Sequence, residues 1–392
     1  LPVSQDFEYP YANQGNLAIE RQLTKDMSVS ASYIFVGAHH LPHPSNFNQV
    51  NNAALRENFR RCFGVDPTVA SPGSPINSAL GFSPLSCPGA TQIIPGVIAV
   101  NAAGQRILLP AATNFFRPAG PNYLFLRSLG VSKPVFDSLI GNGLTRPGPV
   151  STFGDVNAQV SDGNSVYHAG NFEVKKRFSS NFQFLASYTW SHSIDDSSDL
   201  QTLLLPQDAN NLRNDRSDSL FDQRHRFVFS GVLASPDSWR GSDGGLRRFL
   251  ADFIIAPIFE ASSGRPFNIL TGIDTNNDQT EQTDRPNVAA DGTLVQPPFF
   301  TSGTLGRNRG ITHGYAALDL RLTRSIRLGE NTRLQLIAEG FNLFNRFNEA
   351  SASPFSNDVN AFNERAPGGR YYSRPTAAFD PRQFQFGLRL NF

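Results

Sequence analysis

The last residues of the chain, RQFQFGLRLNF, alternate strictly between apolar and polar side chains. The apolar positions are Phe384, Phe386, Leu388, Leu390 and Phe392, and the polar ones include Gln383, Gln385, Arg389 and Asn391. A period of two is typical of a β-strand with one apolar and one polar face. We therefore expect the apolar set to face lipid or another apolar partner and the polar set to face inward. Register should be well specified, because a slip by one residue exchanges the faces.

The same alternation recurs along the chain, for example in NFQFLASYTWSHSI, RFVFSGVL and AALDLRLTRSIRL. It predicts nine strands, which start near residues 15, 27, 165, 182, 224, 248, 313, 332 and 382. The sixth, FLADFIIAPIFEAS, is apolar on both faces and contains Pro257, so the pattern does not decide its orientation.

The connections between these strands alternate between short and long. Tight hairpin turns are predicted at 23–26, 178–181 and 328–331, whereas residues 39–164 form one long insertion rich in Pro, Gly and Asn. Loops beyond about 12–15 residues are uncommon in compact soluble domains. Outer-membrane barrels, in contrast, combine short periplasmic turns with long extracellular loops. The pattern predicts an all-β, antiparallel, up-and-down transmembrane β-barrel, present as a partial barrel of about nine strands. Residues 1–392 then form a single barrel portion with 39–164 as an extracellular loop and no plug domain.

A soluble β-sandwich would alternate in the same way, since one face of each sheet packs on the core. Three features favour a membrane instead. The strands are longer than the average soluble strand of about 5–6 residues, aromatic residues cluster at strand ends as in an interfacial girdle, and the polar faces carry charges of both signs, which a sandwich core does not accept. These charged residues are Glu173, Lys175, Arg226, Asp319, Arg321, Arg333, Glu339 and Arg389.

The composition limits the classes of partner that the chain is expected to bind. The net charge of the 392 residues is +1, so no long-range field favours nucleic acid, and we expect no nucleic-acid partner. No apolar run reaches the ~18 residues of a transmembrane helix, and the first residues, LPVSQDFEYP, lack the features of a signal peptide. The chain is therefore either intracellular or has lost its original N-terminus. The 33 Phe residues suit strands better than helices.

The two cysteines, Cys62 and Cys87, lie in the same Pro/Gly/Asn-rich segment. A lone pair of this kind favours a disulfide and an oxidising compartment, with two free buried thiols as the alternative.

Candidate metal sites are weak. DTNNDQTEQTD places Asp274, Asn276 and Asp278 at alternate positions, which resembles the start of a calcium loop, but the glycine and glutamate of that motif are missing. A solvated extracellular loop is the competing interpretation. Three histidines at a strand end could bind a transition metal or could simply be exposed. They are His39, His40 and His43. Apart from calcium, no cofactor is expected.

A mixed-charge run between residues 213 and 226 suggests a salt-bridged, solvated loop. Its members are Arg213, Asp215, Arg216, Asp218, Asp222, Arg224 and Arg226. No catalytic arrangement of nucleophile, base and acid is evident, so we do not expect an enzyme.

Several segments in order resemble the C-terminal barrel of TonB-dependent outer-membrane receptors, and within that family the Oar-like branch with a carboxypeptidase-regulatory-like domain. They are YHAGNFEVKKRFSSNFQFLASYTWSHSIDD, FDQRHRFVFSGVL, TDRPN, AEGFNLFNRFN and FQFGLRLNF. The resemblance implies a barrel of the bacterial outer membrane, an N-terminal plug, and uptake energised by the TonB complex. It also implies that the terminal strand ending in Phe392 is an assembly signal read by the outer-membrane insertion machinery.

The chain departs from that family in lacking a plug, a TonB box and part of the strands. We therefore expect it to need either the missing N-terminal barrel and plug portion or a partner chain, in addition to outer-membrane lipid. The leading function is energised uptake of a scarce or bulky substrate. The alternatives are a structural or surface subunit that pairs with other chains through its open strand edges and, third, a soluble all-β binding protein.

Overall fold

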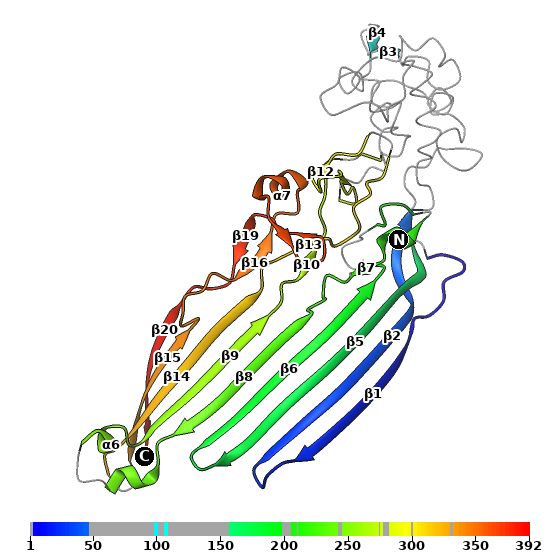
Figure 1. Cartoon of the computed structure of the whole chain (residues 1–392). Coiled ribbons are helices and arrows are strands. Elements are labelled where there is room, and N and C mark those ends of the chain that lie inside the picture. The colour runs from blue at the N-terminus through cyan, green and yellow to red at the C-terminus, as the bar shows by residue number, and fades with distance from the viewer. Residues whose placement is uncertain are drawn as a thin grey trace.

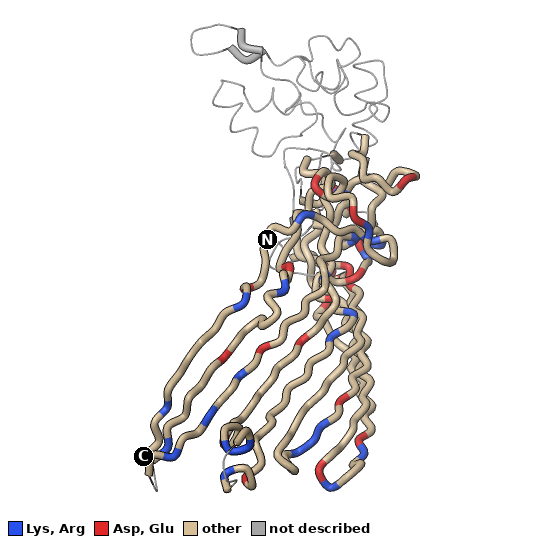
Figure 2. Tube along the Cα trace, turned by 60° about the vertical axis from the view of Figure 1, so that its left-hand side comes forward, with Lys and Arg blue, Asp and Glu red and all other residues tan. Residues whose placement is uncertain are grey.

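The described residues form a long curved sheet with a folded region at one end (Figure 1). The computed structural model describes residues 3–46, 98–100, 106–108, 157–197, 205–209, 211–241, 245–273, 275–276, 282–298, 301–329 and 332–392. Parts of the sheet seen face-on in Figure 1 are edge-on in Figure 2, so the strands follow a curved wall and not a flat layer. No helix in these ranges is long and apolar enough to cross a membrane.

The main sheet has the strand order β1-β2-β5-β6-β8-β9-β14-β15-β20, with the short β7 beside β6. Its strands are β1 (Tyr11–Gln22), β2 (Met27–Asn46), β5 (Asn157–Ser179), β6 (Phe182–Asp195), β7 (Ser217–Asp218), β8 (His225–Ala234), β9 (Phe253–Ser262), β14 (Tyr315–Arg327), β15 (Arg333–Phe341) and β20 (Gln383–Asn391). Strands that follow one another in this order are antiparallel. The predicted fold class is confirmed: one antiparallel nine-strand sheet that resembles part of an outer-membrane barrel.

All three predicted hairpins are present. Residues 23–26 join β1 to β2, and Arg327 pairs with Arg333 across the turn between β14 and β15. In the turn between β5 and β6, Ser180 and Asn181 both have positive φ, at 49° and 69°. Two such residues in a row define the turn type whose twist matches that of antiparallel strands.

Two predicted boundaries differ from the structure. β2 and β5 remain paired up to Asn46 and Asn157, so strand extends into both ends of the segment 39–164 expected as a loop. The sixth strand starts at Phe253 and not near 248, because residues Gly245–Phe249 form the short helix α6.

Pro257 lies inside β9 and is accommodated at a break in one ladder. On the β14 side it is paired with Leu320. On the β8 side, the pairing passes from Ser230–Ile258 to Leu233–Ile255 and omits the positions between them. Since proline has no N–H to donate, the strand loses hydrogen bonds to one neighbour only.

The long connections fold against one another at the end of the sheet opposite to the short turns (Figure 1). We call the described residues of 205–224, 263–314 and 342–382 the loop cap. It contains the 3₁₀ helix η3 (Leu212–Asp215), α7 (Ser356–Phe362), and the short strands β10 (Pro266–Phe267), β11 (Asn287–Val288), β12 (Leu294–Val295), β13 (Gly310–Ile311), β16 (Glu349–Ala352), β17 (Arg365–Ala366), β18 (Arg370–Tyr371) and β19 (Pro375–Ala378). Outside the cap lie β3 (Ile98–Val100), β4 (Arg106–Leu108) and η4 (Asp237–Gly241).

The loop cap has its own small apolar core. Its members are Ile269, Leu294, Leu305, Val359 and Tyr371, with Phe267 packed against them. Because these residues come from two different connections, β9–β14 and β15–β20, the core ties these two loops to each other. The C-terminal end of β20 lies at the opposite end of the sheet, beside the short turns (Figure 1).

Candidate functional site

One face of the main sheet is apolar across all nine strands. Residues that are paired across antiparallel strands point to the same face, so the register identifies this face residue by residue. It carries Leu17, Ile19, Tyr33, Phe172, Tyr188, Phe227, Phe229, Leu233, Ile255, Phe259, Leu320, Leu322, Leu336, Phe386 and Leu388. Large side chains here are exposed: Phe172 by 56% and Leu388 by 75%. An exposed apolar surface of this extent requires an apolar partner.

The opposite face is polar. It carries Glu20, Ser30, Glu173, Ser187, Arg226, Glu260, Asp319, Arg321, Glu339, Gln385 and Arg389. Acidic and basic residues both occur along the strands (Figure 2), and some pair across neighbours, as Arg226 does with Glu260 at 2.9 Å. Water or a polar filling can accept these groups, whereas hydrocarbon cannot.

The terminal strand follows this division. Leu336 and Leu388 are paired, as are Leu334 and Leu390, so the apolar set of β20 lies on the apolar face. Gln385 and Arg389 pair with Glu339 and Gln335 on the polar face. The predicted separation of the two sets is therefore confirmed. The role of Phe384, Phe386, Leu388, Leu390 and Phe392 as an assembly signal stays a prediction.

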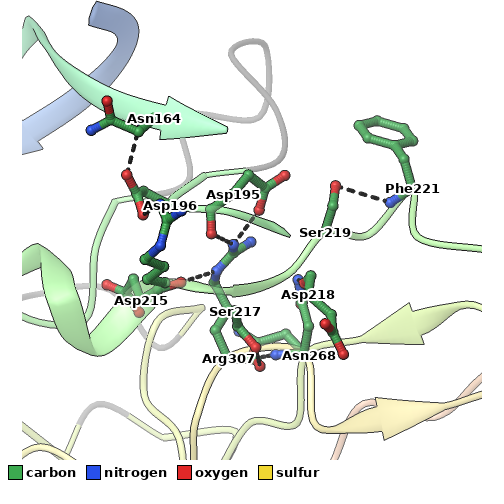
Figure 3. Close-up of polar contacts among 12 residues, drawn as sticks. Asn164, Asp195, Asp196, Asp215, Ser217, Asp218, Ser219, Phe221, Asn268 and Arg307 are labelled. Atoms are coloured by element: carbon green, nitrogen blue, oxygen red, sulfur yellow. Dashed lines mark hydrogen bonds and ion pairs between the residues drawn. The ribbon is translucent and has the colours of Figure 1, made fainter. Parts of the chain in front are cut away.

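Buried ion pairs fix the loop cap to the end of the sheet. Arg307, from the connection between β9 and β14, pairs with Asp195 at the end of β6, and its Nη2 donates to the Asp195 carbonyl at 2.6 Å. Its Nε donates to the carbonyl of Asp215 at 2.6 Å (Figure 3). The neighbouring Asp196 accepts from the backbone N–H of Asn164 at 2.8 Å, which links β5 to the same cluster.

The charged run 213–226 supplies many of the partners. Asp215 pairs with Arg285, and both side chains are almost fully buried. Asp218 pairs with Arg370 and accepts from His192 Nε2 at 2.7 Å. The expected salt bridges are thus present, but the expectation of a solvated loop is wrong for the acidic residues Asp215 and Asp222, which are each only 2% exposed. The acidic residues are covered because Asp215 and Asp218 pair with Arg285 and Arg370 from distant parts of the chain, whereas Asp222 pairs with Arg224 inside the run. The arginines Arg213, Arg216 and Arg226 remain exposed.

At the start of α7, the partly exposed carboxylate of Asp358 is also held by its neighbours. The Ser353 hydroxyl lies 2.5 Å from Asp358 Oδ2 and is the main cause that lowers the pKa of Asp358, with Arg374 at 3.2 Å contributing.

A cavity of about 580 Å³ opens between the upper ends of β8, β9 and β14 and the loop cap. Glu260 and Tyr315 border it from the sheet, and His313 and Glu349 border it from the cap. Sequence reasoning did not single out His313 or Glu349, because they are 36 positions apart and belong to no motif.

The predicted metal and disulfide residues are only partly placed. Asp274 and Asp278 lie outside the described residues; Asn276 is buried, and its Nδ2 donates to the Gln207 carbonyl at 3.1 Å. Cys62 and Cys87 also lie outside the described residues. The calcium site and the disulfide therefore stay predictions.

The histidines near the end of β2 do not converge on one point. His39 contacts Asn164, His40 contacts Glu8, and His43 contacts Asp162. Within the described ranges, no three His, Cys, Asp or Glu side chains lie close enough together to hold a metal ion.

A curved antiparallel sheet with an apolar and a polar face, short turns at one end and long loops at the other is a section of an outer-membrane barrel wall. The chain belongs to the outer membrane beta barrel domain family, whose model matches residues 1–385. It is therefore a protein of the bacterial outer membrane. Among the curated proteins compared with it, none matches.

Several solved outer-membrane transport proteins are similar to the chain. The outer membrane transporter YddB from Escherichia coli shares 10% identity at a TM-score of 0.43, over 100% of this chain and 34% of that one. The ferric-catecholate import receptor Fiu from Escherichia coli shares 11% at 0.39, over 99% and 29%. The FrpB iron transporter from Neisseria meningitidis shares 8% at 0.39, over 99% and 32%. The chain thus spans about a third of the length of these structures.

Proposed function

We propose that the chain is the C-terminal barrel segment of a TonB-dependent outer-membrane receptor of the Oar-like branch. In this role it forms part of the wall through which a scarce or bulky substrate is taken up by energised transport, and it carries out no catalysis. The single observation that best supports the proposal is the two-faced sheet: its apolar face suits lipid and its polar face suits a hydrated interior.

The two outermost strands of the sheet, β1 and β20, indicate that further strands are needed to close the barrel. Within the described part of the chain, β1 pairs only with β2 and β20 pairs only with β15. Hydrocarbon does not tolerate unpaired strand edges, because each free N–H and C=O lacks water there. We propose that an N-terminal barrel and plug portion, or a partner chain, closes the wall between β20 and β1. The plug would engage the TonB complex, and the insertion machinery would read the strand that ends in Phe392.

The experiment is to purify the native protein from outer membranes in detergent, measure its intact mass, and titrate it with the soluble C-terminal domain of TonB. We expect a mass well above the 43.0 kDa of this chain, or a tightly bound partner chain, together with saturable binding of the TonB domain. A native mass of 43.0 kDa with no partner and no TonB binding would contradict the proposal.

The same open edges favour one alternative, a structural subunit that pairs edge to edge with other copies or chains. In that case the native protein should be recovered without detergent as a polymer. A monodisperse detergent complex would exclude it.

A further inference from the structure

The cavity of about 580 Å³ at the cap end of the polar face has the size of a small-ligand site. It is bordered by polar side chains from the sheet and the cap, among them Arg226, Glu260, Arg265 and Tyr315, and by the apolar Phe379. Tyr315 and Phe379 meet edge to face with ring centroids 5.2 Å apart, which gives the cavity one aromatic side.

Glu349 is the unusual group in this cavity. Its side chain is only 1% exposed. One carboxylate oxygen, Oε2, accepts two hydrogen bonds from His313, from the backbone N–H at 2.9 Å and from Nδ1 at 2.7 Å. The other oxygen, Oε1, is buried and has no hydrogen-bond partner among the described residues. Leaving a buried charged acceptor unpaired is costly, so a donor from outside the chain is the natural partner.

The structure around Glu349 holds it in place. The preceding residue, Asn348, accepts from the backbone N–H of Ala316 and donates to the carbonyl of Ala316, both at 2.9 Å, and thereby attaches β16 to the top of β14. The His313 ring is stacked on Tyr372 with centroids 4.1 Å apart. A carboxylate fixed in this way needs little reordering when it binds a ligand.

The cationic groups of the cavity differ in their pairing. Arg226 is neutralised by Glu260 at 2.9 Å. Arg265 is exposed, and in the described part of the chain only its backbone groups have partners: its N–H donates to Thr312 Oγ1 at 2.9 Å, and its carbonyl accepts from the Thr312 N–H at 3.0 Å. The cavity therefore offers one unpaired carboxylate oxygen and one unpaired guanidinium.

A metal ion does not fit this site, because no group of three His, Cys, Asp or Glu side chains in the described ranges is arranged to hold one. We propose that the cavity binds a zwitterionic ligand, an amino acid or a short peptide with free termini. Its ammonium group would donate to Glu349 Oε1, its carboxylate would accept from Arg265, and an apolar side chain would lie against Phe379. This inference rests on the proposed function, since it names the substrate class that the receptor takes up.

The test is calorimetric titration of the native protein in detergent with alanyl-phenylalanine, its N-acetylated form and its C-terminal amide. We expect N-acetylation to weaken binding at least about tenfold, because the ammonium donor is lost. In Glu349→Gln, which preserves the shape and one acceptor for His313, the free and acetylated dipeptides should bind equally weakly. In Arg265→Gln, the free dipeptide and its amide should bind alike. Asp291→Asn removes an exposed carboxylate elsewhere in the cap and should bind like the wild type.

The inference is wrong if the acetylated dipeptide binds the wild type as tightly as the free one, or if Glu349→Gln keeps full affinity while its thermal unfolding is unchanged. The proposed function fails separately. A protein that binds the dipeptide but supports no TonB-dependent uptake of it would retain the site and lose the transport role. A protein that binds TonB but not the dipeptide would retain the transport role and lose the proposed ligand site.

Discussion

Arg307 reaches the end of β6 and pairs with Asp195, 112 positions earlier in the chain, where both side chains are about nine-tenths buried. A long connection of the barrel is thereby attached to the wall by charge and not by strand pairing. Removing one member of such a pair leaves the other buried and uncompensated, which is more costly than losing an exposed pair.

We therefore predict that Arg307→Gln destabilises the loop cap by about 3–5 kcal/mol. The matched control is Arg374→Gln, which breaks a pair with Asp358 at 3.2 Å in which the two side chains are 66% and 31% exposed, and should cost under about 1 kcal/mol. Hydrogen exchange of cap amides in the detergent-solubilised protein measures both. Equal protection in the two variants would show that the buried pair does not hold the cap.

The two faces of the sheet should respond oppositely to a new charge. Leu388→Arg places a guanidinium on the apolar face. It should make folding into lipid vesicles less favourable by about 2–4 kcal/mol if the position lies near the midplane. Gln385→Arg on the same strand places it on the polar face and should be nearly neutral. If both variants fold equally well, the apolar face does not meet lipid.

The last residues test the assembly role of β20. Phe392→Ser should lower the amount of protein inserted in the outer membrane more than Asn391→Ser does, because only Phe392 belongs to the apolar set. Heat-modifiable electrophoresis of membrane fractions would measure the folded fraction. Identical insertion of the two variants would argue against the terminal phenylalanine as a signal.

Gly303 should tolerate no side chain. A Cβ atom there would lie 1.7 Å from the carbonyl oxygen of Arg285, so backbone would have to move. We expect Gly303→Ala to destabilise the cap by about 3 kcal/mol. Gly15→Ala in β1 meets nothing within 4 Å and should change thermal stability little. A normal unfolding temperature for both variants would mean that the cap backbone adjusts freely.

Cys62 and Cys87 are predicted to form a disulfide, which would close a ring of about 26 residues and stabilise the chain by roughly 3 kcal/mol in the loop-entropy model. Mass spectrometry after alkylation without reductant measures it: the native protein should take up no label. Uptake of two labels would establish free thiols.

The strands of the sheet could be predicted because the two faces of a strand produce a pattern that is visible within a short stretch of sequence. A period of two persists over each strand, and turns such as FSSN lie directly between two such runs. α6 escaped prediction because a helix of five residues is too short to show a period of its own. Its apolar residues merged with the run that starts β9.

The loop cap and its cavity could not be predicted in the same way. Asp215 and Arg285 are 70 positions apart, and His313 and Glu349 are 36 apart. No periodicity connects such residues; only the fold of three connections brings them together. The charged run 213–226 therefore suggests a solvated loop when only the sequence is considered, because the sequence does not show which distant residues pair with it.

Pro257 has a mechanical consequence for the wall. Where the ladder between β8 and β9 omits the positions opposite Pro257, the two strands share fewer hydrogen bonds than the strands of the uninterrupted ladders on either side, β6–β8 and β9–β14. Tension applied across the strands, as by a crowded or laterally stressed membrane, would concentrate at this seam. Among the ladders from β6 to β14, the wall would bend most easily between β8 and β9.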